Sequence, residues 1–200
     1  MLKIGLTGSI GMGKTTVAKM FAARGIPVFD ADAAVHQLYA RGGAAVAPVG
    51  AAFPGAVKDG AIDRPALSAL VVGKPAEIKR LEAIVHPLVA RLREDFLSQA
   101  EQRGEAMVVL EIQMLLEGGS AKTLDAIVVV SAPEAMQRDR ALARPGMSEE
   151  KLAGILSNQM PDAEKRARAD YIIDTGVSLA ETEQQVEALI ATLRQKAGSS

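Results

Sequence analysis

Short apolar runs alternate along the chain with longer segments whose apolar residues recur at helical spacing. In the segment Thr16–Arg24 they stand at i, i+3 and i+4, and Gly25 follows where a helix commonly ends. The short runs expected to be strands are Leu2–Thr7, Pro27–Phe29, Ala106–Leu110, Ala126–Val130 and Asp170–Asp174. This alternation predicts an α/β fold with helices on both faces of a five-stranded parallel sheet.

The last segment of the chain carries its own helix signals. Ser178 and Glu181 match a capping box, in which each side chain accepts a hydrogen bond from the other residue's backbone N–H. The apolar residues that follow on one helical face are Val186, Leu189, Ile190 and Leu193. We expect this face to pack against the core and to carry no chemistry.

Two long segments do not fit simple alternation. Residues 33–105 contain helical patterns and no convincing strand, and they are too many for a simple connection. The segment Ala141–Glu164 is rich in Arg and Lys and is interrupted by Pro145, Gly146 and Pro161. The predicted domains are therefore a core of residues 1–32, 104–140 and 165–200, a helical acceptor-binding insertion over 33–103, and a mobile lid over 141–164.

The strongest motif is Gly8–Thr15, GSIGMGKT, which matches the phosphate-loop pattern G-x-x-x-x-G-K-[ST] between a strand and a helix. Glycines let consecutive N–H groups turn toward phosphate oxygens, and the helix N-terminus adds partial positive charge. Lys14 is expected to reach the β- and γ-phosphates, and the Thr15 hydroxyl to bind Mg²⁺. The predicted ATP-binding residues are Gly8, Gly11, Met12, Gly13, Lys14, Thr15 and Thr16.

Composition narrows the function classes. Lys and Arg number 23 against 24 Asp and Glu, and this near balance argues against a dedicated nucleic-acid-binding protein. The absence of Cys excludes disulfides and thiolate metal sites and fits a reducing compartment. The apolar runs are strand-sized, and Gly interrupts the N-terminal run before it could form a signal peptide. We expect a cytoplasmic protein without a membrane, nucleic-acid or obligatory protein partner.

Phosphate loops occur in motor ATPases, in GTPase switches and in kinases of small molecules. The N-K-x-D and D-x-x-G motifs of GTPases are absent from the sequence. A helical insertion and a basic lid favour a small-molecule kinase, in which the insertion holds the acceptor and the lid excludes water. Two alternatives stay open. One is a kinase for another metabolite, such as a nucleotide or sugar acid, and the other is a regulator that binds ATP without transferring phosphate.

The second predicted strand runs into Asp30-Ala31-Asp32, and His36 follows Asp32 by one helical turn. Ligands of open α/β sheets bind at the carboxyl ends of strands. A kinase that acts on an alcohol needs a carboxylate there to orient the hydroxyl and accept its proton. Asp32 is our candidate for this base. Either aspartate could instead be a helix N-cap, and this alternative is stronger for Asp30.

Further motifs extend over nearly the whole chain. They are IGLTGSIGMGKTT (4–16), PVFDADAAVH (27–36), IDR (62–64), LEAIVHPLV (81–89), VVLEIQMLLEGG (108–119), ALARPGMS (141–148), QMPDAEKRARAD (159–170) and YIIDTG (171–176). Together they resemble the dephospho-coenzyme A kinase family. The resemblance implies a three-layer P-loop kinase fold with the strand order of nucleoside monophosphate kinases. It also implies the use of ATP and Mg²⁺ to phosphorylate the ribose 3′-hydroxyl of dephospho-CoA, the last step of coenzyme A biosynthesis.

The resemblance also implies residue roles. Asp32 becomes the catalytic base, and Thr7, Lys14 and Arg144 become catalytic groups around the reacting phosphates. An arginine suits this task because its planar guanidinium grips phosphate oxygens and stays charged. The acceptor-binding residues would be Asp32, His36 and His86.

Arg140, one turn before Arg144, and Arg166 are weaker candidates, because an arginine in such a segment could simply be solvated. One segment departs from the family pattern, which usually follows the third strand with a run like Asp-Ile-Pro-Leu-Leu-Phe-Glu. Here Glu111 keeps a carboxylate that could hold Mg²⁺, directly or through water. Gln113 replaces a proline whose fixed φ helps to shape the turn.

Overall fold

The computed structural model describes residues 1–118 and 120–198, so residues 119 and 199–200 of the predicted core lie outside the described residues. The chain divides into two compact units. Unit 1 comprises Met1–Phe29 and Ala100–Ser200, and unit 2 comprises Asp30–Gln99. No helix in the described ranges is both long and apolar enough to cross a membrane.

A five-stranded sheet forms the centre of unit 1. Its strands are β1 (Leu2–Thr7), β2 (Val28–Asp30), β5 (Met107–Glu111), β6 (Ala126–Ser131) and β7 (Tyr171–Asp174), in the order β2-β5-β1-β6-β7. β1 pairs in parallel with β5 and β6, and β6 pairs in parallel with β7. The expectation of a five-stranded parallel sheet is confirmed, and each strand begins and ends within one residue of its predicted bounds.

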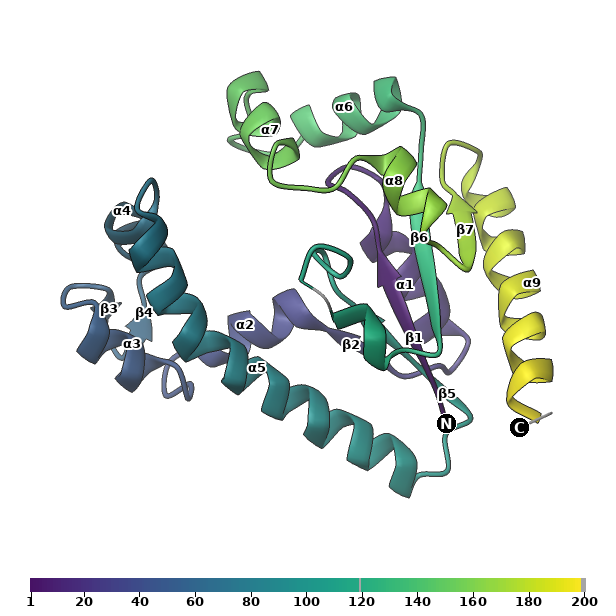
Figure 1. Ribbon diagram of the computed structural model, residues 1–200, viewed down its shortest axis with the longest axis horizontal. Helices are drawn as coiled ribbons and strands as arrows, with labels where there is room; N and C mark the ends of the chain where they lie inside the picture. The colour runs from purple at the N-terminus through teal and green to yellow at the C-terminus, as the bar shows by residue number, and fades with distance from the viewer. Residues whose placement is uncertain (119, 199–200) are drawn as a thin grey trace. The chain divides into compact units, whose positions relative to one another are not determined.

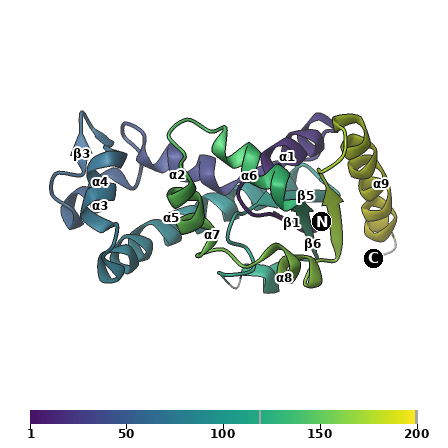
Figure 2. The ribbon, with the colours of Figure 1, turned by 90° about the horizontal axis from the view of Figure 1, so that it is seen from above.

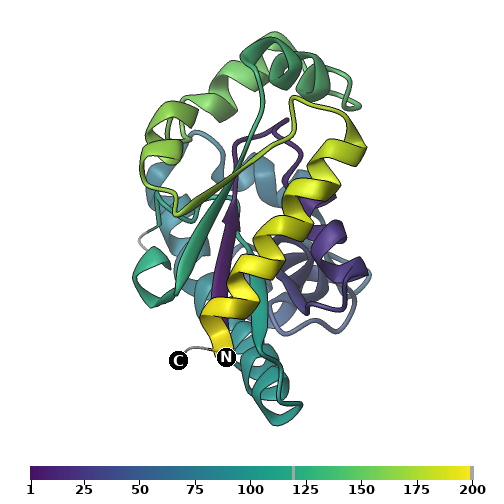
Figure 3. The ribbon, with the colours of Figure 1, turned by 90° about the vertical axis from the view of Figure 1, so that its right-hand side faces the viewer.

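Helices cover both faces of this sheet. α1 (Lys14–Ala23) and α9 (Leu179–Gly198) lie on one face, and α8 (Asp162–Ala167) lies on the other (Figures 2 and 3). The capping box of α9 is confirmed, since Ser178 N–H donates to Glu181 Oε2 at 3.0 Å and Glu181 N–H donates to Ser178 Oγ at 3.2 Å. The predicted apolar face of α9 is buried in the main core. In these three layers the carboxyl end of β1, and the loop that follows it, lie at the carboxyl-terminal end of the sheet.

The predicted lid region belongs to unit 1. α6 (Glu134–Leu142) follows β6, and α7 (Glu149–Leu156) comes between α6 and α8. Figure 1 shows α6 and α7 beyond the carboxyl end of β6. α7 begins at Ser148, whose Oγ accepts a hydrogen bond from Lys151 N–H at 3.3 Å. The lid region therefore lies at the same end of the sheet as the loop after β1.

Unit 2 has a core of its own. Its helices are α2 (Ala31–Tyr39), α3 (Val46–Ala52), α4 (Arg64–Val71) and α5 (Pro75–Gln102), whose last three residues belong to unit 1. Buried residues from all four helices meet in one cluster, which includes Leu38, Val49, Leu67 and Val85. A separate core of this kind allows the segment to be an independently packed insertion.

The expectation that the insertion contains no strand was wrong. β3 (Val57–Lys58) and β4 (Ala61–Ile62) form a small antiparallel hairpin. The two residues between them, Asp59 and Gly60, have φ values of 52° and 77°. Two consecutive left-handed residues make the tight turn that suits the twist of a hairpin, and Asp-Gly is a strong sequence signal for it. The hairpin was missed because each strand has only two residues and no measurable alternation.

Candidate functional site

The phosphate loop, residues 8–15, joins the carboxyl end of β1 to the start of α1. Gly11 and Gly13 have φ values of 80° and 85°, a region that residues with a Cβ rarely adopt. Gly13 is also the N-cap of α1 and makes no side-chain cap hydrogen bond to its first N–H groups. The Thr16 N–H donates to the Gly13 carbonyl at 3.0 Å, while the N–H groups of Lys14 and Thr15 are available to an anion, and the helix dipole favours negative charge there.

Lys14 and Thr15 converge on one carboxylate oxygen. Lys14 Nζ lies 2.6 Å from Glu111 Oε1, and Thr15 Oγ1 donates to the same oxygen at 3.1 Å. Glu111 ends β5, the neighbour of β1 in the sheet, and this adjacency brings it to the loop. Only 3% of the Glu111 side chain and 11% of the Lys14 side chain are exposed. The predicted metal-binding residues Thr15 and Glu111 are therefore brought together.

The chemistry of these two oxygens fits Mg²⁺. This cation prefers oxygen ligands, keeps several waters, and is commonly bound by one or two carboxylates together with substrate phosphates. The Thr15 hydroxyl and the Glu111 carboxylate, 3.1 Å apart beside a phosphate loop, provide such a partial site. No cluster of three or more His, Cys, Asp or Glu side chains with metal-binding geometry occurs within residues 1–118 and 120–198.

Thr7 has a contact that the sequence did not suggest. It is the last residue of β1, it is completely buried, and its Oγ1 donates to the Gln113 carbonyl at 3.1 Å. The contact uses the backbone of Gln113, so the replacement of proline at this position leaves it intact. Thr7 thereby joins the start of the phosphate loop to the segment after β5. Its catalytic role stays a prediction.

Arg140 contacts the phosphate loop through Thr175. Its Nη2 donates to the Thr175 carbonyl at 2.8 Å and its Nη1 to the Thr175 hydroxyl at 3.2 Å. The buried Thr175 hydroxyl donates in turn to the Met12 carbonyl at 2.7 Å. Arg144 and Arg166 are exposed, and neither side chain has a hydrogen bond or ion pair within the described part of the chain. Sequence reasoning missed Thr175, although its position directly after β7 was a usable signal.

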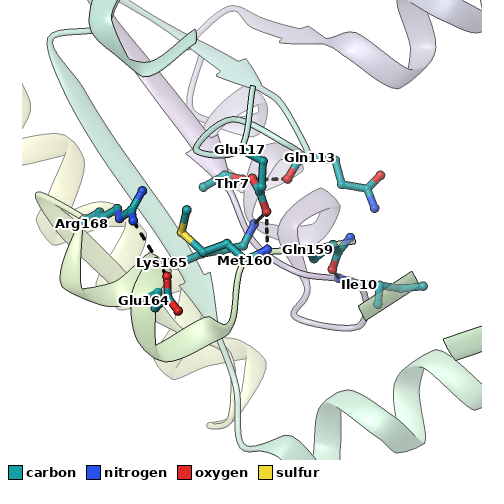
Figure 4. A network of polar contacts seen from close by, with 9 residues as sticks. All are labelled: Thr7, Ile10, Gln113, Glu117, Gln159, Met160, Glu164, Lys165 and Arg168. Atoms are coloured by element: carbon teal, nitrogen blue, oxygen red, sulfur yellow. Dashed lines mark hydrogen bonds and ion pairs between the residues drawn. The ribbon is translucent and has the colours of Figure 1, made fainter. Parts of the chain in front are cut away.

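Figure 4 shows a buried polar network that connects the segment after β5 to α8. Lys165 is completely buried, and its Nζ lies 2.7 Å from Glu117 Oε1. The same oxygen accepts a hydrogen bond from Met160 N–H at 2.7 Å. Burial alone would raise the pKa of Glu117, but the hydrogen bonds from Lys165 and Met160 outweigh it and lower the pKa from its ordinary 4.5. No sequence signal marked this pair, because charged residues in a short helix are normally exposed.

The candidate residues of unit 2 have different environments. Asp30 is the N-cap of α2, and its Oδ1 accepts a hydrogen bond from Ala33 N–H at 2.9 Å. Asp32 lies exposed in the first turn of α2, so the capping alternative for Asp32 is wrong. His36 and His86 are exposed on α2 and α5. The role of Asp32 as a base and the acceptor-binding roles of the two histidines stay predictions.

Comparison with known proteins agrees with the resemblance seen in the sequence. A family model described as dephospho-CoA kinase matches residues 2–181. A dephospho-CoA kinase from Novosphingobium aromaticivorans is 57% identical over 193 residues, which cover 96% of this chain and 95% of that protein. These two matches extend over nearly the whole chain, so they include both units.

Solved structures extend the comparison to the fold. The crystal structure of TT1252 from Thermus thermophilus superposes with a TM-score of 0.82 at 38% identity, covering 96% of this chain and 97% of that one. A dephospho-CoA kinase from Campylobacter jejuni shares the fold, with a TM-score of 0.72, 23% identity, and coverage of 97% and 98%. The fold, the phosphate loop and the extent of these matches agree: this chain belongs to the dephospho-CoA kinase family.

Proposed function

We propose that this enzyme transfers the γ-phosphoryl group of ATP to the ribose 3′-hydroxyl of dephospho-CoA, giving coenzyme A and ADP. The observation that carries the proposal is the convergence of Lys14 and Thr15 on the buried Glu111 carboxylate, in a phosphate loop of a chain of this family. We place the reaction in the cytoplasm, since a chain without Cys fits a reducing compartment.

The phosphate loop binds the ATP phosphates through its N–H groups and through Lys14. The Lys14 ammonium pairs with Glu111. Bound phosphates offer this ammonium a stronger negative partner, and its movement to them leaves the Glu111 carboxylate and the Thr15 hydroxyl to hold Mg²⁺. When bound, the cation neutralises charge on the β- and γ-phosphates. Arg140, bonded to Thr175, supplies further positive charge from α6, and the unpaired Arg144 supplies it from the lid region, 141–164.

The acceptor is activated by Asp32, which accepts the proton of the 3′-hydroxyl as that oxygen attacks the γ-phosphorus. The bond between the γ-phosphorus and the oxygen bridging to the β-phosphate breaks, and ADP leaves. Phosphoryl transfer of this kind depends mainly on positioning and charge neutralisation. The exposed carboxylate of Asp32 is free of the capping task that Asp30 performs. In this proposal residues 33–103, with His36 and His86, bind the acceptor.

The direct test is ATP consumption by the purified protein with dephospho-CoA, compared with adenosine and AMP at the same concentrations. We expect ADP formation with dephospho-CoA and a product phosphorylated at the 3′-position, identified by mass spectrometry and phosphorus NMR. Equal turnover with adenosine or AMP would favour a kinase for another metabolite. ATP binding without turnover of any acceptor would favour a regulator.

A further inference from the structure

Ile10 occupies a variable position of the phosphate-loop motif, yet its backbone is held on both sides. Its N–H donates to Gln159 Oε1 at 3.1 Å, a contact drawn in Figure 4. Its carbonyl accepts a hydrogen bond from Gln137 Nε2 at 2.9 Å. Both glutamines are buried, with 7% and 8% of their surface exposed. Two buried amides are thus devoted to one peptide segment of the loop.

One glutamine precedes the lid region in the sequence and the other lies within it. Gln137 is in α6, shortly before the lid begins, and Gln159 follows α7, close to its end. The Ile10 side chain is itself buried in a small cluster with Ala141 and Leu152. One residue of the phosphate loop therefore contacts α6 just before the lid region, and contacts the lid region itself near its end and in its apolar centre.

The fit between α6 and the loop is close. A Cβ atom at Gly11 would lie 2.4 Å from the Gln137 carbonyl oxygen, so the backbones approach without room for a side chain. Arg140 follows Gln137 by about one helical turn, so whatever fixes α6 against Ile10 also fixes the origin of the Arg140 side chain. Arg140 is therefore placed relative to the loop by a contact that is not itself charged.

We propose that Ile10, Gln137 and Gln159 are positioning residues that couple the lid region to the phosphate loop. The proposal rests on the proposed function in taking ATP as the ligand of the loop. ATP binding and the ordered position of the lid then stabilise each other, because a coupling between two sites acts equally in both directions. A lid released from Ile10 leaves the phosphates with fewer ordered cationic partners.

The two glutamines use opposite ends of their amides, which makes the coupling testable by isosteric change. Gln137→Met removes the donor to the Ile10 carbonyl, and Gln159→Met removes the acceptor for the Ile10 N–H, while both keep the length of the side chain. We expect each variant to weaken ATP binding, measured by calorimetry without acceptor, by about tenfold, which corresponds to ~1.4 kcal/mol. The KM for ATP should rise similarly, while the KM for dephospho-CoA stays within about twofold, since unit 2 is untouched.

The double variant tests whether both amides act through the same peptide. Residues that share a partner are not additive, because loss of one contact frees the partner from the other. We expect the double variant to bind ATP clearly more weakly than either single variant. The loss of affinity should nevertheless be well below the hundredfold that two additive effects would give. Hydrogen exchange across residues 142–156 should rise in all three variants and in Ile10→Val, which removes one methyl group from the lid cluster and should fold normally.

Two controls separate coupling from a merely structural role. Gln184→Met makes the same change on an exposed position of α9, and Val186→Ala creates a cavity in the main core. Val186→Ala should lower the thermal midpoint without changing ATP affinity. The proposal is overturned if the glutamine variants only lower the midpoint, if ATP affinity is unchanged, or if the double variant is additive. Because ATP affinity is measured without acceptor, a wild-type protein that binds ATP but leaves dephospho-CoA unmodified contradicts the proposed function alone.

Discussion

The candidate phosphate-binding groups of unit 1 and the candidate acceptor-binding groups of unit 2 are held in opposite ways. In unit 1, Lys14 and Thr15 share a carboxylate oxygen of the buried Glu111. In unit 2, Asp32 and His36 are exposed on α2, and their side chains make no hydrogen bond or ion pair within the described ranges. One set of groups is fixed by contacts within the protein, and the other is not.

This difference suits the two tasks. Charge that develops during phosphoryl transfer is stabilised best by groups that need no reorganisation at the moment of reaction. An acceptor of several chemical parts is recognised by side chains that reach it from helices, and their order can come from the ligand itself. Substitutions at Lys14 and Glu111 should therefore affect both stability and activity, whereas those at the exposed groups of unit 2 should affect activity alone.

The largest effect is expected at Lys14. Lys14→Ala should lower turnover by about 10³ or more, because loss of even one donor to a developing charge costs ~10²–10³ in rate. It also leaves the buried Glu111 carboxylate without its cation, so the thermal midpoint should fall. The double variant Lys14→Ala/Glu111→Gln should recover the midpoint but not the activity. Turnover comparable to wild type would refute the assignment of the loop.

The next largest effect is expected at Asp32, and it should distinguish the role of Asp32 in catalysis from the role of Asp30 as a helix cap. Asp32→Asn keeps the shape of the side chain but cannot accept a proton, so kcat should fall by ~10²–10⁴ with little change in ATP affinity. Its thermal midpoint should match wild type, because Asp30 caps α2. Asp30→Ala should show the reverse pattern, a loss of about 1 kcal/mol of stability with most activity retained. A fully active Asp32→Asn enzyme would exclude Asp32 as the base.

A third prediction concerns the buried pair Glu117–Lys165, whose effect should be confined to stability. Lys165→Met leaves a largely buried carboxylate unpaired and should reduce the free energy of unfolding by about 3 kcal/mol. Lys165→Met/Glu117→Gln should recover much of that loss, since both charges are then absent. Urea denaturation of the single and double variants measures this. Equal stability of Lys165→Met and wild type would show that the pair contributes nothing.

The smallest expected effect concerns the stability of the protein at acid pH. The pKa of Glu117 in the folded protein lies below its ordinary 4.5, so the pair contributes stability that is fully present above pH 4.5. That contribution is lost as the pH falls below 4.5 through the folded-state pKa. Glu117→Gln should therefore flatten the acid side of the stability profile, whereas Glu183→Gln, on the exposed surface of α9, should not. Parallel profiles for both variants and wild type would contradict this account.

Much of unit 1 could be predicted because its signals are local. Strand and helix are marked by short apolar runs and by the capping box at Ser178 and Glu181. The phosphate loop is encoded in eight consecutive residues, since its binding groups are mostly backbone N–H groups whose direction depends on glycine conformation. The sequence by itself thus determined the sheet, the phosphate loop and the family.

Only the tertiary structure decided which distant polar groups meet. Glu111 reaches Thr15 because β5 lies next to β1, and strand order is a long-range property. The choice of Asp30 over Asp32 as the helix cap depended on where α2 begins, which sequence patterns leave uncertain by a residue or more. The same holds for Gln137 and Gln159, whose amides look like surface groups in the sequence. A buried amide must find a partner once water is excluded, and folding alone determines that partner.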